Sequence, residues 1–257
     1  MRRPSDRTIA VTGSASGIGA ALSSLLREQG HRVIGVDLRD AEVIADLATS
    51  EGRLAAASSV SAAADGVLDG VVTCAGTSMP SPVLVQLNFF GTTEFITALQ
   101  PALAASPVPR VAVVGSISAT QQADDDVVAA CLAGDESLAL KAAAATIADR
   151  RAHQLYPSSK SALAQWVRRT AIEPGWASAG IPLNVVAPGV VLTPMTEELI
   201  ADPAMKEIMD TAVPMPLNGY LQASDVAQVL AFLVSEENSH ITGQVVFVDG
   251  GAEVTLR

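Results

Sequence analysis

Two short motifs carry residues that can do complementary chemistry. Residues 12–19 read Thr-Gly-Ser-Ala-Ser-Gly-Ile-Gly, and residues 156–160 read Tyr-Pro-Ser-Ser-Lys. The first motif is a glycine-rich segment that can hold a dinucleotide, which carries a hydride. The second places a phenol and an ammonium four positions apart, on one face of a helix, where the phenol can exchange a proton. Together they predict a nicotinamide-dependent oxidoreductase acting on an alcohol and a carbonyl compound.

The glycine-rich segment fits the turn between a strand and a helix. Thr8–Thr12 is predicted as the strand, and the helix that starts near Gly17 would direct its free N–H groups at a pyrophosphate. Gly13 permits a tight turn, Gly17 lets a phosphate approach the backbone, and Gly19 allows the helix to pack closely on the strand. The spacing G-x-x-x-G-x-G differs from the general G-x-G-x-x-G fingerprint. For this segment alone, a glycine-rich turn without a ligand remains an open alternative.

An acidic residue ends the next predicted strand, Arg32–Asp37. A carboxylate at Asp37 can accept both hydroxyls of an adenosine ribose, and it would repel a 2′-phosphate. The position therefore predicts NAD rather than NADP as cofactor. Arg39 weakens that preference, because a nearby arginine can accommodate a phosphate. A solvated aspartate at the end of a strand is the alternative interpretation.

The phenol needs help to act near neutral pH, because an unperturbed tyrosine has a pKa of about 10. Lys160 is predicted to lie close enough to Tyr156 to favour the phenolate, together with the positive charge of a nicotinamide. Lowering the pKa by about three would require roughly 4 kcal/mol. Pro157 disfavours helical backbone at the residue before it and fits the first helical position. We therefore expect the helix to begin at Pro157, with Tyr156 as its cap.

Composition excludes several other classes of function. The chain has 257 residues, of which 49% are hydrophobic and 17% charged, and its net charge is −11. This charge argues against nucleic acid or an anionic membrane as partner. Two cysteines, Cys74 and Cys131, suit a reducing compartment, and the three scattered histidines predict no metal. The start, Met1-Arg-Arg-Pro, faintly resembles a twin-arginine signal, but we expect a cytoplasmic protein without a membrane span.

Short apolar runs alternate with alanine- and leucine-rich stretches, which is typical of a parallel sheet built from βαβ units. The predicted strands are Thr8–Thr12, Arg32–Asp37, Glu42–Asp46, Gly70–Cys74, Arg110–Gly115, Pro182–Val186 and Gln244–Val248. Predicted helices include 17–29 and 221–235, the latter with Ser224 and Asp225 as caps. The sequence thus predicts an α/β fold in one domain, residues 1–257, with a Rossmann-type doubly wound sheet of about seven strands.

The chain resembles the short-chain dehydrogenase/reductase family along essentially its whole length. Within the family it is most similar to the 3α-hydroxysteroid dehydrogenase/carbonyl reductase type, through Val33–Arg53, Thr73–Gly76 and the long separation of Ser116 from Tyr156. The family motif Asn-Asn-Ala-Gly is changed here, where threonine and cysteine replace both asparagines. We expect Cys74 to be an inert buried thiol.

The resemblance implies roles for further residues. Ser116 would bind and polarise the substrate oxygen, Tyr156 would exchange the proton, and Lys160 would also hold the nicotinamide ribose. Asn88 would hold a water that links Lys160 to solvent. Asp46 and Leu47 would contact the adenine, and the Val191 backbone and Thr193 hydroxyl the carboxamide. The implied cofactor contacts are Gly13, Ser16, Gly17, Ile18, Gly19, Asp37, Asp46, Leu47, Ala75, Gly76, Tyr156, Lys160, Val191 and Thr193.

Two segments differ from the core of such a fold. Met195–Gly219 carries four methionines and three prolines and is interpreted as a substrate lid, although its methionines can equally be packing residues. Ala119–Leu155 is a long insertion, predicted as one or two helices broken near Gly134, with Asp135 and Ser137 as caps. The insertion either blocks the tetrameric arrangement usual in the family, which leaves a homodimer formed through the last strand, or is a tolerated surface insertion.

The resemblance and the motifs together predict interconversion of a secondary alcohol and a ketone, on a hydroxysteroid or another bulky apolar small molecule. A 3-oxoacyl-thioester reductase that uses NADPH is the alternative enzyme. A non-catalytic NAD-binding regulator is the alternative from another class.

Overall fold

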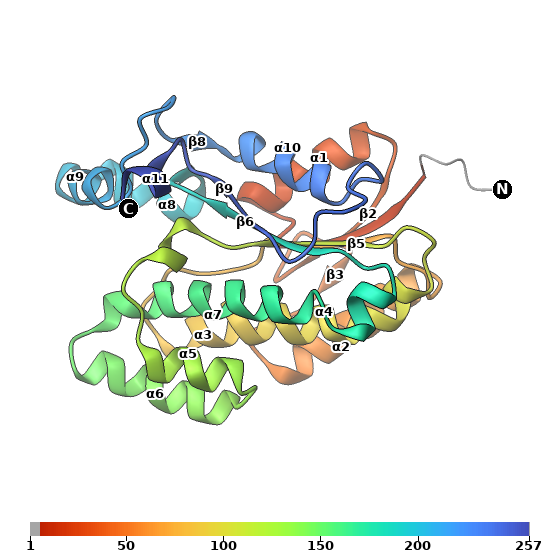
Figure 1. Ribbon diagram of the computed structural model, residues 1–257, viewed down its shortest axis with the longest axis horizontal. Helices are drawn as coiled ribbons and strands as arrows, with labels where there is room; N and C mark the ends of the chain where they lie inside the picture. Colours follow the sequence, from red (N-terminus) through yellow and green to blue (C-terminus); the bar gives the residue numbers. More distant parts are fainter. Residues whose placement is uncertain (1–5, 257) are drawn as a thin grey trace.

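A seven-stranded parallel sheet forms the middle layer of the molecule, with helices on both faces (Figure 1). The computed structural model describes residues 6–256, so the twin-arginine-like start lies outside the described residues. The strands are β1 (Thr8–Thr12), β2 (Arg32–Asp37), β3 (Val43–Ile44), β4 (Gly70–Thr73), β5 (Arg110–Val114), β6 (Leu183–Pro188) and β9 (Val245–Val248). A second, two-stranded sheet joins β7 (Val191–Leu192) to β8 (Leu221–Gln222).

The order of the strands creates a crevice at the carboxyl ends of the sheet. The order is β3-β2-β1-β4-β5-β6-β9, so β1 pairs with β2 on one side and with β4 on the other. The connections after β1 and β4 leave in opposite directions, and ligands of open α/β sheets bind at such a switch point. The predicted doubly wound α/β fold is confirmed, and β1 and β2 match their predicted bounds at both ends.

Alternate residues of the strands contribute their side chains to two apolar layers, one on each face of the sheet. Ile9 and Val11 of β1 face a cluster formed with α1 (Gly17–Glu28) and α10 (Ala223–Leu233). Ala10, between them, faces the opposite cluster. This period of two is what a strand buried on both faces requires.

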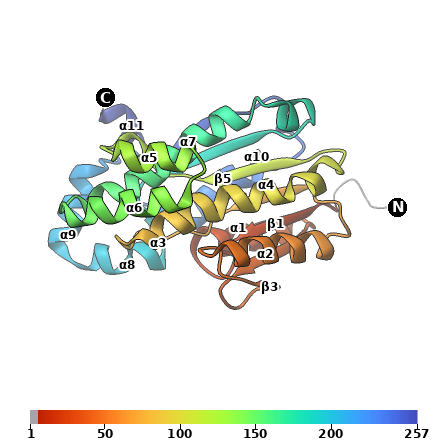
Figure 2. The ribbon, with the colours of Figure 1, turned by 90° about the horizontal axis from the view of Figure 1, so that it is seen from below.

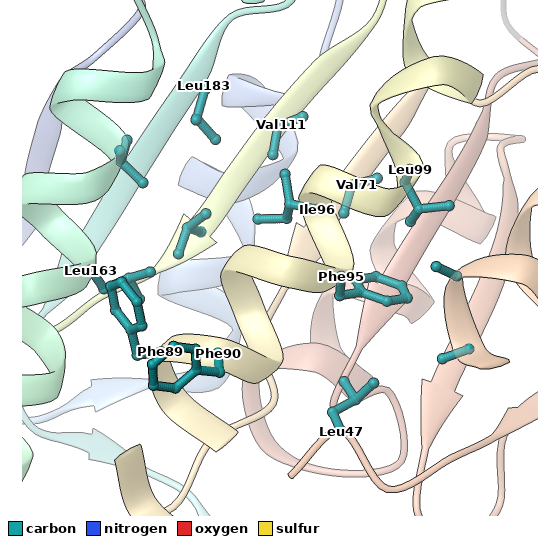
Figure 3. Close-up of a cluster of buried hydrophobic side chains, with 14 of the residues drawn as sticks. Leu47, Val71, Phe89, Phe90, Phe95, Ile96, Leu99, Val111, Leu163 and Leu183 are labelled. Carbon is teal, nitrogen blue, oxygen red and sulfur yellow. The ribbon is translucent and has the colours of Figure 1, made fainter. Parts of the chain in front are cut away.

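The opposite apolar layer lies under three long helices, α2 (Ser50–Ala63), α4 (Gly91–Ala104) and α7 (Leu155–Thr170). Figure 3 shows aromatic and aliphatic side chains of α4 meeting those of β4 and β5 there. The shorter elements are α3 (Pro82–Val85), a π-helical turn (Gln86–Phe90), 3-10 turns (Ile117–Thr120 and Ala152–Gln154), a second π-helical turn (Pro174–Ser178) and α11 (Ala252–Thr255). No helix among residues 6–256 is long and apolar enough to cross a membrane.

The long insertion forms two helices, α5 (Asp125–Leu132) and α6 (Glu136–Ala148), which pack beside α7 and α3 (Figure 2). Asp135 caps α6 as predicted, because its carboxylate accepts a hydrogen bond from the Leu138 N–H at 2.8 Å. The prediction for Ser137 is wrong, since it lies inside α6. Asp124 caps α5, which the sequence analysis did not predict.

Helix α7 begins one residue before Tyr156, so the prediction that Tyr156 is the cap is wrong. A 3-10 turn at Ala152–Gln154 already has helical backbone and leads into α7 at Leu155. Pro157 is then the third residue of the helix, in the first turn, where a backbone N–H has no intrahelical partner to lose.

The start of α10 also differs from the prediction. The chain forms β8 at Leu221–Gln222 first, and Gln222 then caps a helix that begins at Ala223. Asp225 takes part in the cap, because its carboxylate accepts a hydrogen bond from the Gln222 N–H at 2.7 Å. Ser224 lies within the helix and is not its cap.

Candidate active site

A cleft of about 500 Å³ opens at the carboxyl ends of the central strands. It is lined by every predicted site residue except Asn88, namely Gly13, Ser16, Gly17, Ile18, Gly19, Asp37, Asp46, Leu47, Ala75, Gly76, Ser116, Tyr156, Lys160, Val191 and Thr193. These residues come from segments spread over the whole chain, and the parallel sheet gathers them because its strands end at one edge.

The glycine-rich turn is packed too tightly for side chains. A Cβ added to Gly13 would lie 2.8 Å from the Ala75 nitrogen, and one added to Gly19 would lie 2.2 Å from the Gly13 carbonyl oxygen. Gly13 also has a φ of +67°, which favours glycine. The turn therefore presents bare backbone to the cleft at the start of α1.

The start of α1 fits a phosphate group. Ser16 is the N-cap residue, yet its side chain makes no capping hydrogen bond, and the first turn of α1 contains no acidic residue. The helix thus directs first-turn N–H groups and the positive end of its dipole into the cleft. By contrast, the carboxylates of Asp124 and Asp135 cap the starts of α5 and α6.

Two carboxylates line the cleft near the carboxyl ends of β2 and β3. Asp37 accepts hydrogen bonds from the Ala15 N–H at 3.0 Å and the Leu38 N–H at 2.7 Å, which hold it beside the glycine-rich turn. Asp46 accepts one from the Ala48 N–H at 2.9 Å. Arg39 is exposed and does not line the cleft. An adenosine ribose fits acceptors of this kind, whereas a 2′-phosphate would meet the Asp37 carboxylate.

The segment Thr73–Gly76, in which threonine and cysteine replace the asparagines of the family motif, is held by Thr12. The sequence analysis predicted no such role for Thr12. The Thr12 hydroxyl accepts hydrogen bonds from the N–H groups of Cys74 and Ala75, both at 3.1 Å. Among the described residues, the buried Thr73 hydroxyl has no hydrogen-bond partner. Burial raises the pKa of Cys74 to about 12, so this thiol stays protonated and inert.

The Tyr156 side chain lies close to a serine and a lysine. Ser116 follows β5, and its hydroxyl forms a hydrogen bond with the Tyr156 phenol. The Lys160 Nζ lies 5.7 Å from the centre of the Tyr156 ring and donates a hydrogen bond to the Val114 carbonyl at 2.9 Å. Strand β5 and helix α7 therefore bring the three side chains together.

In the protein alone, burial has the largest effect on the pKa values of Tyr156 and Lys160. Burial raises the pKa of Tyr156, although the Ser116 hydrogen bond acts in the opposite direction. Burial also lowers the pKa of Lys160 to about 8. Lys160 lies beside the ring and is itself bound to Val114, so the predicted lowering of the phenol pKa by the lysine together with a nicotinamide stays a prediction. A cationic nicotinamide is the remaining source of such an effect.

Asn88 lies behind the cleft, buried in the π-helical turn. Its side-chain amide bonds the Thr77 N–H and carbonyl, each at 2.9 Å, and its Nδ2 also donates to the Ser159 hydroxyl at 3.2 Å. These bonds tie the loop after β4 to the catalytic helix. The water relay through Asn88 stays a prediction.

Part of the cleft wall is mainly apolar and comes from two helices, α8 (Pro194–Ala201) and α9 (Pro203–Ala212), which belong to the segment predicted as a substrate lid. The residues that line it from 194–213 are Pro194, Met195, Thr196, Leu199, Ile208, Met209, Ala212 and Val213. The cleft is also lined by polar residues that the sequence analysis did not predict, Thr77, Ser78, Ser118 and Gln121. Each of these four follows a predicted strand within a few residues, which was the available signal.

Neither the cleft nor the rest of the described chain offers a metal site. No group of three or more His, Cys, Asp or Glu side chains within residues 6–256 is arranged to hold an ion. Both cysteines are free.

Comparisons with known proteins agree with this geometry. The family profile described as enoyl-(acyl carrier protein) reductase matches residues 13–253. The chain is 37% identical over 253 residues to the 3-alpha-hydroxysteroid dehydrogenase/carbonyl reductase of Comamonas testosteroni, with 97% of each chain covered. It is 30% identical to the cis-4-hydroxycyclohexanecarboxylate dehydrogenase of Sinomonas cyclohexanicum, with 96% of each covered. The crystal structure of the 3-alpha-hydroxysteroid dehydrogenase from Pseudomonas sp. B-0831 complexed with NADH is 42% identical, with a TM-score of 0.90, covering 97% of this chain and 98% of that one.

Proposed function

Because the chain belongs to the short-chain dehydrogenase/reductase family, we propose that it is an NAD(H)-dependent oxidoreductase that interconverts a secondary alcohol and a ketone. The observation that carries the proposal is the convergence of Ser116, Tyr156 and Lys160 on the cleft that the glycine-rich turn opens into. A proton donor and a dinucleotide site in one cleft are what this reaction needs.

The chain's own residues would handle the substrate oxygen and its proton. In reduction, the Tyr156 phenol donates its proton to the ketone oxygen while the Ser116 hydroxyl hydrogen-bonds the same oxygen. In oxidation, the Tyr156 phenolate takes the proton of the alcohol. Lys160, held by the Val114 carbonyl, keeps a positive charge beside the tyrosine at neutral pH.

The bound cofactor would supply or accept the hydride, as nicotinamides do. We assign its pyrophosphate to the start of α1, its adenosine ribose to Asp37 and its nicotinamide to the segment that contains Val191 and Thr193. NAD(H) is favoured over NADP(H), because Lys160 is the one lysine or arginine among the described residues that line the cleft. That lysine lies at the catalytic end, so it cannot pair with a 2′-phosphate.

We propose a bulky, neutral, apolar substrate, with 3α-hydroxysteroids as the first class to test. The lid helices α8 and α9 line the cleft with aliphatic and methionine side chains, and these suit a shape-tolerant apolar pocket. A 3-oxoacyl thioester bound to an acidic carrier is disfavoured, since the protein carries a net charge of −11.

We also propose a cytoplasmic homodimer, joined through β9 and its neighbouring helices. All four residues of β9, at the edge of the sheet, are half-buried, and Phe232 of α10 and Val254 of α11 are exposed. Such an apolar edge favours pairing with a second copy. The two free thiols, of which Cys131 is buried and Cys74 partly buried, suit a reducing compartment. Light scattering that gave a tetramer would contradict the dimer.

The test of the function is NADH absorbance on mixing the protein with NAD and a 3α-hydroxysteroid, repeated with NADP. We expect turnover with NAD and little with NADP. Tyr156→Phe should abolish turnover and leave NADH binding intact, because it removes the hydroxyl and keeps the ring. An unchanged rate in this variant would refute the mechanism, and a panel of other alcohols would follow if the steroid gave no turnover.

A further inference from the structure

Arg53, on helix α2, is a charged residue with no exposed surface. A buried guanidinium needs partners for its charge and its donors. Two acidic residues supply them: Glu94 of α4 lies 2.8 Å from its Nη1, and Glu136 of α6 lies 2.7 Å from its Nη2. Glu136 belongs to the long insertion and comes from its second helix.

The remaining donors of Arg53 bind backbone at the edge of the cleft. Its Nε donates to the Leu47 carbonyl at 3.1 Å, and its Nη2 donates to the Ala48 carbonyl at 3.0 Å. Asp46 and Leu47 line the cleft at the end where we place the adenine. One side chain thus joins the insertion to the adenine-binding segment.

Close packing surrounds both the Arg53 guanidinium and the Leu47 residue that it binds. The Arg53 guanidinium lies 5.9 Å from the centre of the Phe90 ring. Figure 3 shows the Leu47 side chain pointing toward Phe95. A Cβ added to Gly91 would come within 2.8 Å of the Leu47 carbonyl oxygen, which leaves that carbonyl little room to move.

We propose that Arg53 is a positioning residue for the adenine end of the cofactor, and that the inserted helix α6 sets cofactor affinity through Glu136. This inference rests on the proposed function, since it assumes that the cleft binds a dinucleotide. It gives the insertion a role other than blocking assembly or covering surface.

Glu136 is well placed to exert this control. It accepts hydrogen bonds from both terminal nitrogens of Arg53 and a further one from the Gln86 Nε2 at 3.1 Å. Without Glu136, a buried guanidinium would keep the half-exposed Glu94 as its acidic partner. Arg53 would then shift toward Glu94 or solvent and loosen its bonds to the Leu47 and Ala48 carbonyls.

The test is calorimetric binding of ADP-ribose, which contains the adenosine and the pyrophosphate but no nicotinamide. We expect Arg53→Met to weaken ADP-ribose binding at least tenfold and Glu136→Ala to weaken it severalfold, with kcat at saturating NAD within about twofold of the wild type. The double variant should bind no more weakly than Arg53→Met, because both changes act through one path. Two matched controls alter exposed residues: Arg32→Met removes an arginine, as Arg53→Met does, and Glu28→Gln removes a carboxylate, as Glu136→Ala does. Both controls should bind ADP-ribose as the wild type does.

The outcomes separate this inference from the function. Unchanged ADP-ribose affinity in both variants, with a wild type that binds, would overturn the inference and leave the function standing. A wild type that binds neither ADP-ribose nor NADH would overturn both. Should Arg53→Met fail to fold, Glu136→Ala decides the matter, since Glu136 is partly exposed and alanine removes the acceptor for the Arg53 hydrogen bonds: unchanged affinity there would refute the role of α6.

Discussion

The two halves of the cleft are held in different ways. At the cofactor end, backbone packs on backbone: Gly19 leaves no room for a Cβ beside Gly13, which in turn packs against Ala75. At the substrate end, none of the residues of α9 is buried, and Ile208 is 58% exposed. The cofactor end is therefore set by the fold itself, whereas the substrate end can change its side chains without disturbing the sheet.

Exposed polar contacts stabilise helix α9. Lys206 and Asp210 form an ion pair at 2.6 Å across one turn of α9, and the Tyr220 hydroxyl donates to Asp210. Exposed pairs of this kind contribute about 1 kcal/mol or less. The contrast with the glycine-rich turn indicates that one cleft can combine a tightly packed backbone turn with a loosely packed apolar wall. The following changes test that contrast.

The largest effect is expected at the glycine-rich turn. Gly19→Ala places a Cβ 2.2 Å from the Gly13 carbonyl oxygen, so α1 must move away from the turn. We expect NADH binding, followed by fluorescence titration, to weaken about 1000-fold, or roughly 4 kcal/mol. Gly175→Ala is the control, since its Cβ would have Gln100 Nε2 at 3.9 Å as its nearest neighbour. Wild-type affinity in Gly19→Ala would refute the packing argument.

The second prediction concerns how the stability of the protein depends on pH through the buried Lys160. Burial lowers the folded-state pKa of Lys160 to about 8 from an ordinary value of 10.5, so between these pH values the unfolded chain binds the extra proton. Stability therefore rises with pH in this window, by about 3 kcal/mol. Denaturant unfolding at pH 7 and pH 11 should show this rise in the wild type relative to Lys160→Met. Lys206→Met, which changes an exposed residue of α9, should keep the rise in the free energy of unfolding. If this free energy changed equally with pH in the wild type and in Lys160→Met, the burial argument would be contradicted.

A smaller effect is expected at Asp37, the strand-end residue that we propose selects the cofactor. Asp37→Ser removes the carboxylate that would repel a 2′-phosphate but keeps a hydroxyl near the Ala15 N–H. The ratio of kcat/KM for NAD to that for NADP should fall at least about tenfold, which is about 1.4 kcal/mol. Asp40→Ser, an exposed change three residues away, should leave the ratio unaltered. No change at Asp37 would mean that another residue selects the cofactor.

The smallest effect on the fold is expected in the lid. Ile208→Ala should change stability by less than about 0.5 kcal/mol, because the side chain is largely exposed. The KM for a bulky apolar alcohol should nevertheless rise severalfold, while the KM for NAD stays constant. Steady-state kinetics with both substrates varied would check this. Equal changes in both KM values would show that the lid is not separate from the cofactor end.

Much of the fold could be predicted because its signals are local. The apolar β-branched runs of β1 and β2 gave the correct strand bounds, and the glycine spacing located the turn between β1 and α1. The cleft residues could be predicted for the same reason, since they follow strand ends that a parallel sheet brings to one edge. The helix starts were less predictable, because a 3-10 turn before Leu155 and the strand β8 compete with the local cap signals.

By itself the sequence determined the α/β class, the glycine-rich turn between β1 and α1 and the spacing of Tyr156 and Lys160, because backbone sterics and helical periodicity act over a few neighbouring residues. The tertiary structure alone decided how buried those two side chains are, and hence the directions of their pKa shifts. It also decided that Arg53 meets Glu136, 83 positions away, at the adenine end of the cleft. Such contacts depend on how distant segments pack together, and no local pattern records that packing.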